Sequence, residues 1–142
     1  MRMIFVNLPV KDVQASRRFF AALGFTFNEQ FSDERTASVV IEENIVVMLL
    51  QEERFRDFIV GDISDTSKGK EVLTCLSCSS RDEVNTLTEK ALAAGGKSWK
   101  EPQDYGFMYG RSFQDPDGHV WEVMWMDPAA VMPQGETAEA AA

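Results

Sequence analysis

The sequence predicts an α+β protein built from two βαβββ modules in tandem. The order of strand, helix and three strands occurs over about residues 3–51 and again over about 72–127. The segment FFAALGFTF in the first half matches ALAAGGKSW in the second, and ENIVVMLL matches GHVWEVMW, at offsets of 72 and 75 residues. The two halves are therefore expected to be structural repeats that bury their apolar sheet faces together.

The first module is predicted to have a helix between its first two strands. Residues 3–10 are apolar and β-branched, as is typical of a strand, and Pro9 marks its end or an edge. Asp12 is suited to cap a helix that has one apolar face and ends near Gly24. Three short strands are then expected at residues 25–31, 36–42 and 44–51.

A linker of about twenty residues, 52–71, separates the modules and is too long for a routine connection. It carries Phe55, Phe58 and Ile59 among mixed charges. We therefore expect it to pack on the protein or to cover something.

The second module repeats the pattern of the first. Residues 72–79 are predicted to form a strand, and Ser80 with Glu83 forms a capping box that opens a helix ending at Gly95-Gly96. Strands are expected at 97–100, 107–114 and 119–126. The domain is expected to span 1–128, whereas 129–142 has no periodic apolar face and is expected to be disordered.

The composition of this 142-residue chain restricts the classes of partner. Its net charge of −9 argues against nucleic acid, because phosphate binding needs a basic surface, and it permits a cationic ligand. No apolar run approaches the length of a membrane span and no leader pattern is present, so we expect a cytoplasmic protein without membrane contact. Cys75 and Cys78 should point to opposite faces of a strand and are interpreted as small buried hydrophobic side chains.

The closing hairpin contains the strongest candidate site residue. Its turn, Asp115-Pro116-Asp117-Gly118, suits a reversal because proline presets φ and glycine supplies a positive φ. The period of two puts Trp121, Val123 and Trp125 towards the core and Glu122 on the other face. A carboxylate among apolar neighbours is costly to bury without a partner. Glu122 is therefore either a site residue or a structural residue with a local hydrogen-bond donor.

The segment 104–111 is a second candidate, because it places four aromatic or basic side chains between glycines: Tyr105, Phe107, Tyr109 and Arg111. Such groups beside a sheet suit a flat or cationic ligand through stacking and cation–π contacts. Ordinary core and edge packing explains them equally well.

The motifs KDVxxSxxFFxxLGF and FxDPDGHxWEV, together with the duplicated βαβββ order, resemble the vicinal oxygen chelate superfamily, which includes glyoxalase I, extradiol dioxygenases, fosfomycin-modifying enzymes and bleomycin-binding proteins. The resemblance covers about residues 3–127 and is strongest to an uncharacterised branch labelled lactoylglutathione lyase-like. It implies curved half-barrel sheets around a cleft. Because such concave faces expose apolar surface, we expect a homodimer, whose modules pair within one chain or swap between chains.

The resemblance also implies one divalent metal held by His, Gln or Glu side chains on four strands. The corresponding positions are held by Phe5, by Val47 or Met48, by Thr74 or Leu76, and by Glu122. Only Glu122 is a suitable ligand, so we expect neither a metal nor another cofactor. His119, the sole histidine, is expected to stabilise the turn or to lie at the surface.

Asn7 shares the parity of Phe5 and, by the same resemblance, should face the cleft, where its amide could donate to Glu122 or to a ligand. The expected ligand-binding residues are therefore Phe5, Asn7, Tyr105, Phe107, Tyr109, Arg111 and Glu122.

Three functions remain open on these grounds. The protein could bind a small organic, cationic or aromatic molecule without a metal. It could be a lyase- or isomerase-type enzyme that uses Glu122 as a catalytic general base. It could also be an interaction domain without a small ligand.

Overall fold

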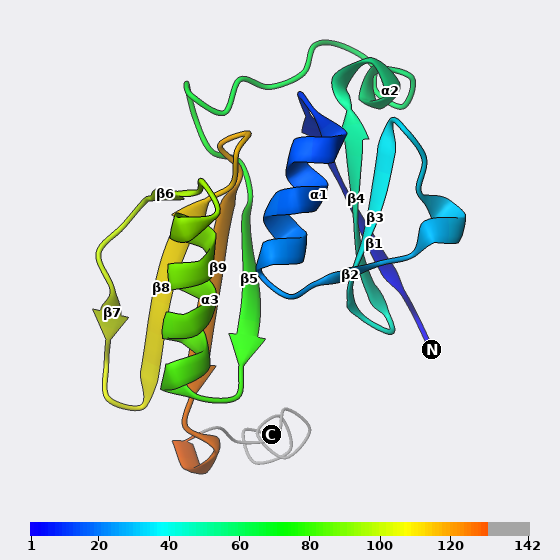
Figure 1. Ribbon diagram of the computed structural model, residues 1–142. Helices are drawn as coiled ribbons and strands as arrows, with labels where there is room; N and C mark the ends of the chain where they lie inside the picture. Colours follow the sequence, from blue (N-terminus) through cyan, green and yellow to red (C-terminus); the bar gives the residue numbers. More distant parts are fainter. Residues whose placement is uncertain (131–142) are drawn as a thin grey trace, which may run out of the picture.

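The computed structural model describes residues 1–130 and has the predicted α+β architecture (Figure 1). The first module contains β1 (Ile4–Val10), α1 (Val13–Ala22), β2 (Thr26–Phe27), β3 (Thr36–Glu42) and β4 (Ile45–Gln51). Its strands form sheet A in the order β1-β4-β3-β2, with β1 parallel to β4 and the other pairs antiparallel.

The second module repeats this topology with β5 (Leu73–Cys78), α3 (Arg81–Ala93), β6 (Lys97–Ser98), β8 (Met108–Gln114) and β9 (Val120–Met126). These strands form sheet B in the order β5-β9-β8-β6, and β5 is parallel to β9 as β1 is to β4. The short strand β7 (Gln103–Asp104) also pairs with β8. In each module the first strand runs parallel to the last one, β1 to β4 and β5 to β9, which confirms the internal repeat.

The strand β7 was not expected, and three further segments differ from the sequence prediction. The strand predicted at 25–31 ends after β2. The Asn28 side chain accepts a hydrogen bond from the Gln30 amide and so begins the one-turn helix η1 (Glu29–Phe31). The linker starts with an unpredicted helix, α2 (Glu52–Arg56). A last turn, η2 (Pro128–Ala130), follows β9. The disorder predicted for the rest of the tail concerns residues that lie outside the described part of the chain.

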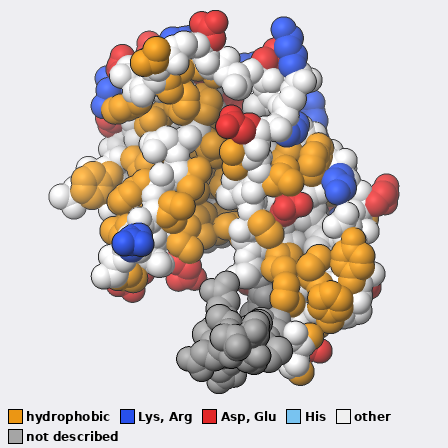
Figure 2. Space-filling view, turned by 180° about the vertical axis from the view of Figure 1, so that it is seen from behind, with side chains coloured by type: hydrophobic (Ala, Val, Ile, Leu, Met, Phe, Trp, Pro, Cys, Tyr) orange, Lys and Arg blue, Asp and Glu red, His pale blue; other side chains and the backbone are white. Residues whose placement is uncertain are grey.

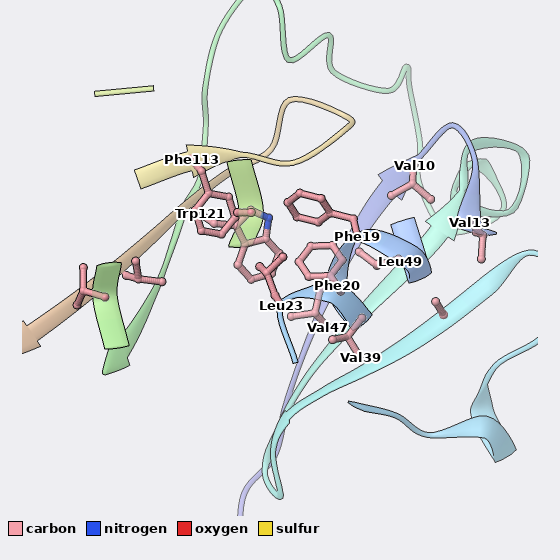
Figure 3. Packing of buried hydrophobic residues seen from close by; sticks show 14 residues of the cluster. Val10, Val13, Phe19, Phe20, Leu23, Val39, Val47, Leu49, Phe113 and Trp121 are labelled. Carbon is pink, nitrogen blue, oxygen red and sulfur yellow. The ribbon is translucent and has the colours of Figure 1, made fainter. Parts of the chain in front are cut away.

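Helix α1 lies between the two sheets and joins the modules into one core (Figures 1 and 3). Phe20 packs edge-on against Trp121 with ring centroids 5.1 Å apart, and Phe19 lies 6.1 Å from Phe113. The Trp121 side chain is 1% exposed. Burial of aromatic rings is among the largest apolar contributions to stability, so this contact holds the second module to the first.

The predicted turn also connects the modules. Gly118 has a φ of 82°, and the buried Asp115 accepts hydrogen bonds from the Asp117 and His119 amides and from the Trp121 indole. The Lys11 amide, just before α1, donates to Asp117 at 2.8 Å. His119 Nε2 lies 2.7 Å from the Pro9 carbonyl oxygen of β1, so the histidine has the turn-stabilising role that the sequence suggested.

Within residues 1–130, no helix combines the length and the apolarity that a membrane crossing requires. A cytoplasmic location stays a prediction from the sequence.

Candidate functional site

Glu122 lies on the open face of sheet B, which we define as the face opposite α3. Trp121 and Val123 are buried in the core, whereas Glu122 between them is half-buried and points the other way. The period-two argument for this strand is confirmed.

The strand register places Glu122 in a short row across the open face. Cys75 of β5 is its partner on one side, and Ser112 of β8 is its partner on the other. A cavity of about 310 Å³, which we call the Glu122 cavity, lies against this row and includes Met108 and Met124 in its wall. Its size falls within the usual range of small-molecule sites.

The Glu122 carboxylate has no hydrogen-bond or ion-pair partner in the described part of the chain. The ammonium of Lys100, which also lines the cavity, lies 5.8 Å from the centre of the Trp99 ring and forms no ion pair with Glu122. The local donor that would make Glu122 purely structural is therefore missing, and the charge is left to solvent or to a ligand.

Cys75 is the neighbour that the sequence prediction misjudged, because it is exposed on the open face and lines the cavity. Cys78 lies on the core side, so the two thiols do point to opposite faces. Although the residue is exposed, neighbouring groups exclude part of the water around its sulfur, and this desolvation, followed by the charge of Glu122, raises the pKa of Cys75. This thiol is thus protonated at neutral pH and is a weak nucleophile.

Asn7 does not donate to Glu122, contrary to the contact suggested by its parity. Its amide lies 3.5 Å from the Phe5 carbonyl oxygen and lines a different cavity, described below. In sheet A, Asn7 pairs with Met48, which pairs with Ser38. This row repeats Cys75, Glu122 and Ser112 in sheet B, so Met48 is the internal counterpart of Glu122.

Tyr109 and Arg111 lie on the helix side of sheet B, away from Glu122. The Tyr109 hydroxyl donates to Asn85 of α3 at 2.7 Å, and Arg111 donates to Asn85 at 3.1 Å and to Glu89 at 2.9 Å. Their side chains attach α3 to β8, and Arg111 also belongs to the lining of the Glu122 cavity. A role for either residue in ligand binding stays a prediction.

Tyr105 and Phe107 are exposed on the loop between β7 and β8, and Arg81 fixes that loop. The Arg81 guanidinium makes two hydrogen bonds with Asp104, at 2.9 and 2.8 Å, and a third with the Gly106 carbonyl oxygen. The bonds from Arg81 to the Asp104 carboxylate, and next the hydrogen bond that the Gly106 amide donates to it, lower the pKa of Asp104 to about 2. A bidentate pair of this kind restricts the loop geometry.

We predict that this attachment weakens in acid. Because the folded-state pKa of Asp104 lies below its ordinary value of 3.8, the stabilisation is present above about pH 4 and is lost as the pH falls through about 2. Carbon-detected NMR titration should find Asp104 near its lowered pKa in the wild type and near about 4 in Arg81→Gln. An Asp104 that titrates near 4 in the wild type contradicts this account of the loop.

The donor set around Glu122 does not fit the divalent metal that the resemblance implies. The adjoining positions hold a protonated thiol and a serine, and sheet A offers an amide and a thioether. Across residues 1–130, no three His, Cys, Asp or Glu side chains are grouped so that they could hold a metal ion. One carboxylate does not select an ion against water.

Comparison with known proteins gives a consistent family. The family model described as Glyoxalase/Bleomycin resistance protein/Dioxygenase superfamily matches residues 2–123. A hypothetical protein from S. aureus is 27% identical, with a TM-score of 0.75 over 88% of this chain and 94% of that one. A search of curated proteins finds no match.

Two further solved structures share the fold at lower identity. A glyoxalase/bleomycin resistance protein/dioxygenase family enzyme from Burkholderia phytofirmans is 18% identical, with a TM-score of 0.72 over 89% of this chain and 99% of that one. A genomically encoded fosfomycin resistance protein from Listeria monocytogenes is 17% identical, with a TM-score of 0.61 over 88% of this chain and 93% of that one. Because the family model covers most of the sequence, the chain belongs to the Glyoxalase/Bleomycin resistance protein/Dioxygenase superfamily.

Proposed function

We propose that the protein binds a small organic cation, without a metal, in the Glu122 cavity. The observation that carries this proposal is a half-buried carboxylate at a cavity wall that makes no hydrogen bond or ion pair with the described chain, although Lys100 and Arg111 also belong to the lining. A positively charged ligand group compensates such a charge, and the flanking Met108 and Met124 offer apolar, polarisable contacts for its remainder. The net charge of −9 attracts cations to the protein.

The alternative is an enzyme of the glyoxalase class that uses Glu122 as a general base. The same unpaired carboxylate supports it, because a base must reach its substrate without being occupied by a protein donor. Cys75 does not add a nucleophile, since its pKa is raised.

A thermal-shift screen with quaternary ammonium, guanidinium and neutral aromatic compounds tests the proposal. A ligand that binds only the folded state raises the unfolding midpoint with concentration. Aromatic cations are expected to raise it in the wild type and not in Glu122→Gln. A screen in which only anions or neutral compounds act would contradict cation binding.

We also predict that the cavity has no stoichiometric site for a transition metal. Calorimetric titration with Zn²⁺, Ni²⁺ or Mn²⁺ should show no one-to-one binding, because the strand neighbours of Glu122 are a protonated thiol and a serine, and no three His, Cys, Asp or Glu side chains of residues 1–130 are grouped around a metal position. A tight one-to-one site that disappears in Glu122→Gln would prove this wrong.

We further propose a homodimer that covers the open faces of the sheets. Figure 2 shows apolar side chains gathered over the side of the molecule turned away from α3. On the edge strands, Phe5 and Leu73 have the parity of the open faces and are 54% and 46% exposed. Contiguous exposed apolar surface of this kind is typical of an association face.

Phe5→Asp should therefore shift the protein from dimer to monomer in sedimentation velocity at tens of micromolar, because a buried carboxylate on each subunit opposes association. Phe58→Asp is the matched control, since Phe58 is as exposed but lies in the linker. A wild-type monomer at these concentrations would exclude the dimer.

A further inference from the structure

A second cavity, of about 340 Å³, lies beneath the linker, and we call it the linker cavity. One wall comes from Phe55, Ile59 and Ile63 of the linker, and the other from Pro9 of β1 and Val120 of β9. Within residues 1–130, the residues that line it differ from those that line the Glu122 cavity. We propose that it binds a small uncharged apolar molecule that donates one hydrogen bond.

The linker is held over this cavity by contacts of its second half. It crosses from the first sheet to the second above the junction of the modules (Figure 1). The Thr66 hydroxyl donates to the Asp117 carbonyl oxygen at 2.6 Å, and the Lys70 ammonium donates to the carbonyl oxygens of Thr66 and Gly118. These bonds fix the roof of the cavity to the turn of the second module.

The apolar side chains of the linker are not part of the shared core. Phe55, Ile59 and Ile63 are half-buried, and the core cluster contains none of them. Their apolar surface instead lines the linker cavity. Side chains of this type at a cavity wall favour an apolar occupant, because its transfer from water is favourable.

His119, which lines the cavity, offers a ligand one hydrogen-bond acceptor. The carbonyl oxygen of Pro9 can only accept, so the His119 Nε2 that lies 2.7 Å away carries the proton. In the neutral ring, Nδ1 is then an acceptor, and no donor in residues 1–130 contacts it.

Among the described residues that line the cavity, the one basic side chain, Lys70, is already engaged. Lys70 donates to three protein oxygens, the third being the Gln114 side chain at 3.2 Å, so it offers no free charge to an anion. Asp62 and Glu71, also in the lining, oppose an anionic ligand as well. A neutral molecule with one hydrogen-bond donor matches both the free acceptor of His119 and the lack of an available cation.

Fluorescence titration with N-phenyl-1-naphthylamine tests the proposal, because this probe is uncharged and aromatic and has a single N–H. At about pH 8, the full chain should bind it saturably with one site. The N-methyl derivative lacks the donor and should bind about tenfold more weakly.

Variants locate the probe. Ile59→Asp should weaken binding at least about tenfold, because it places a carboxylate in the apolar wall. Phe58→Asp, one residue away but outside the lining, and Glu122→Gln should both bind as the wild type does. Since Ile59 lies outside the core, all three variants should keep the wild-type unfolding midpoint. Absence of saturable binding, equal binding of the N-methyl derivative, or loss of binding in Glu122→Gln but not in Ile59→Asp would each overturn the proposal.

Discussion

Trp121→Ala is expected to lower the free energy of unfolding by about 3–5 kcal/mol, the usual cost of removing a fully buried large aromatic side chain. The indole packs against Phe20 of α1 and donates to the buried Asp115. The substitution therefore opens a cavity between the modules and removes a donor from a buried carboxylate. Urea unfolding followed by circular dichroism measures the change.

Trp99→Ala is the control, because Trp99 is only half-buried and lies outside the core cluster. It should cost under about 1 kcal/mol. Since the core is shared between the modules, the wild type should unfold in one transition. A Trp121→Ala protein as stable as Trp99→Ala, or two separate transitions in the wild type, would contradict a single core.

Glu122→Gln is expected to weaken the binding of a cationic ligand by about 10- to 150-fold. Contacts to a charged group are worth about 1.5–3 kcal/mol, and each 1.4 kcal/mol corresponds to a factor of ten. Glutamine keeps the shape and most of the hydrogen bonding of glutamate, so the fold should hold. Isothermal calorimetry with a ligand from the thermal-shift screen provides the measurement.

Glu101→Gln is a matched control for Glu122→Gln. Glu101 lines the same cavity but is exposed, so its charge is screened by water and its removal should change affinity less than threefold. If Glu122 is instead a general base, the Gln variant should keep binding while turnover falls by about two to four orders of magnitude. If it is only structural, stability should fall and binding should not change.

The sequence predicted the parts of the fold that depend on local pattern. The turn at Asp115–Gly118 follows from its proline and glycine, and the period of two places Trp121 and Glu122 on opposite faces. The helix caps at Asp12 and Ser80 were also predicted correctly, because each side chain accepts from amides of the first helical turn.

Strand register decides which of the predicted side chains share the face of Glu122. The hairpin pairs Ser112 with Glu122, so the side chains of Tyr109 and Arg111 have the opposite parity and meet α3. Counting back from the turn could have shown this. Cys75 was interpreted as buried because local composition does not show which face of β5 packs on the core. The pairing of Cys75 with Glu122 places the thiol on the open face.

The separation of Asn7 from Glu122 could not be predicted from either module. Asn7 holds in sheet A the place that Cys75 holds in sheet B, beside the counterpart of Glu122, and its separation from Glu122 depends on how α1 packs between the sheets. The linker cavity depends on the same packing, since it lies at the junction of the modules.

The most direct test of cation binding by Glu122 uses two ligands of the same shape. Calorimetry should compare (4-hydroxyphenyl)trimethylammonium with 4-tert-butylphenol, which differ in charge and hardly in volume. The wild type is expected to bind the cation at least about tenfold more tightly, and Glu122→Gln should bind both equally. Equal affinities in the wild type, or a preference for the cation that persists in Glu122→Gln, would contradict the proposed function.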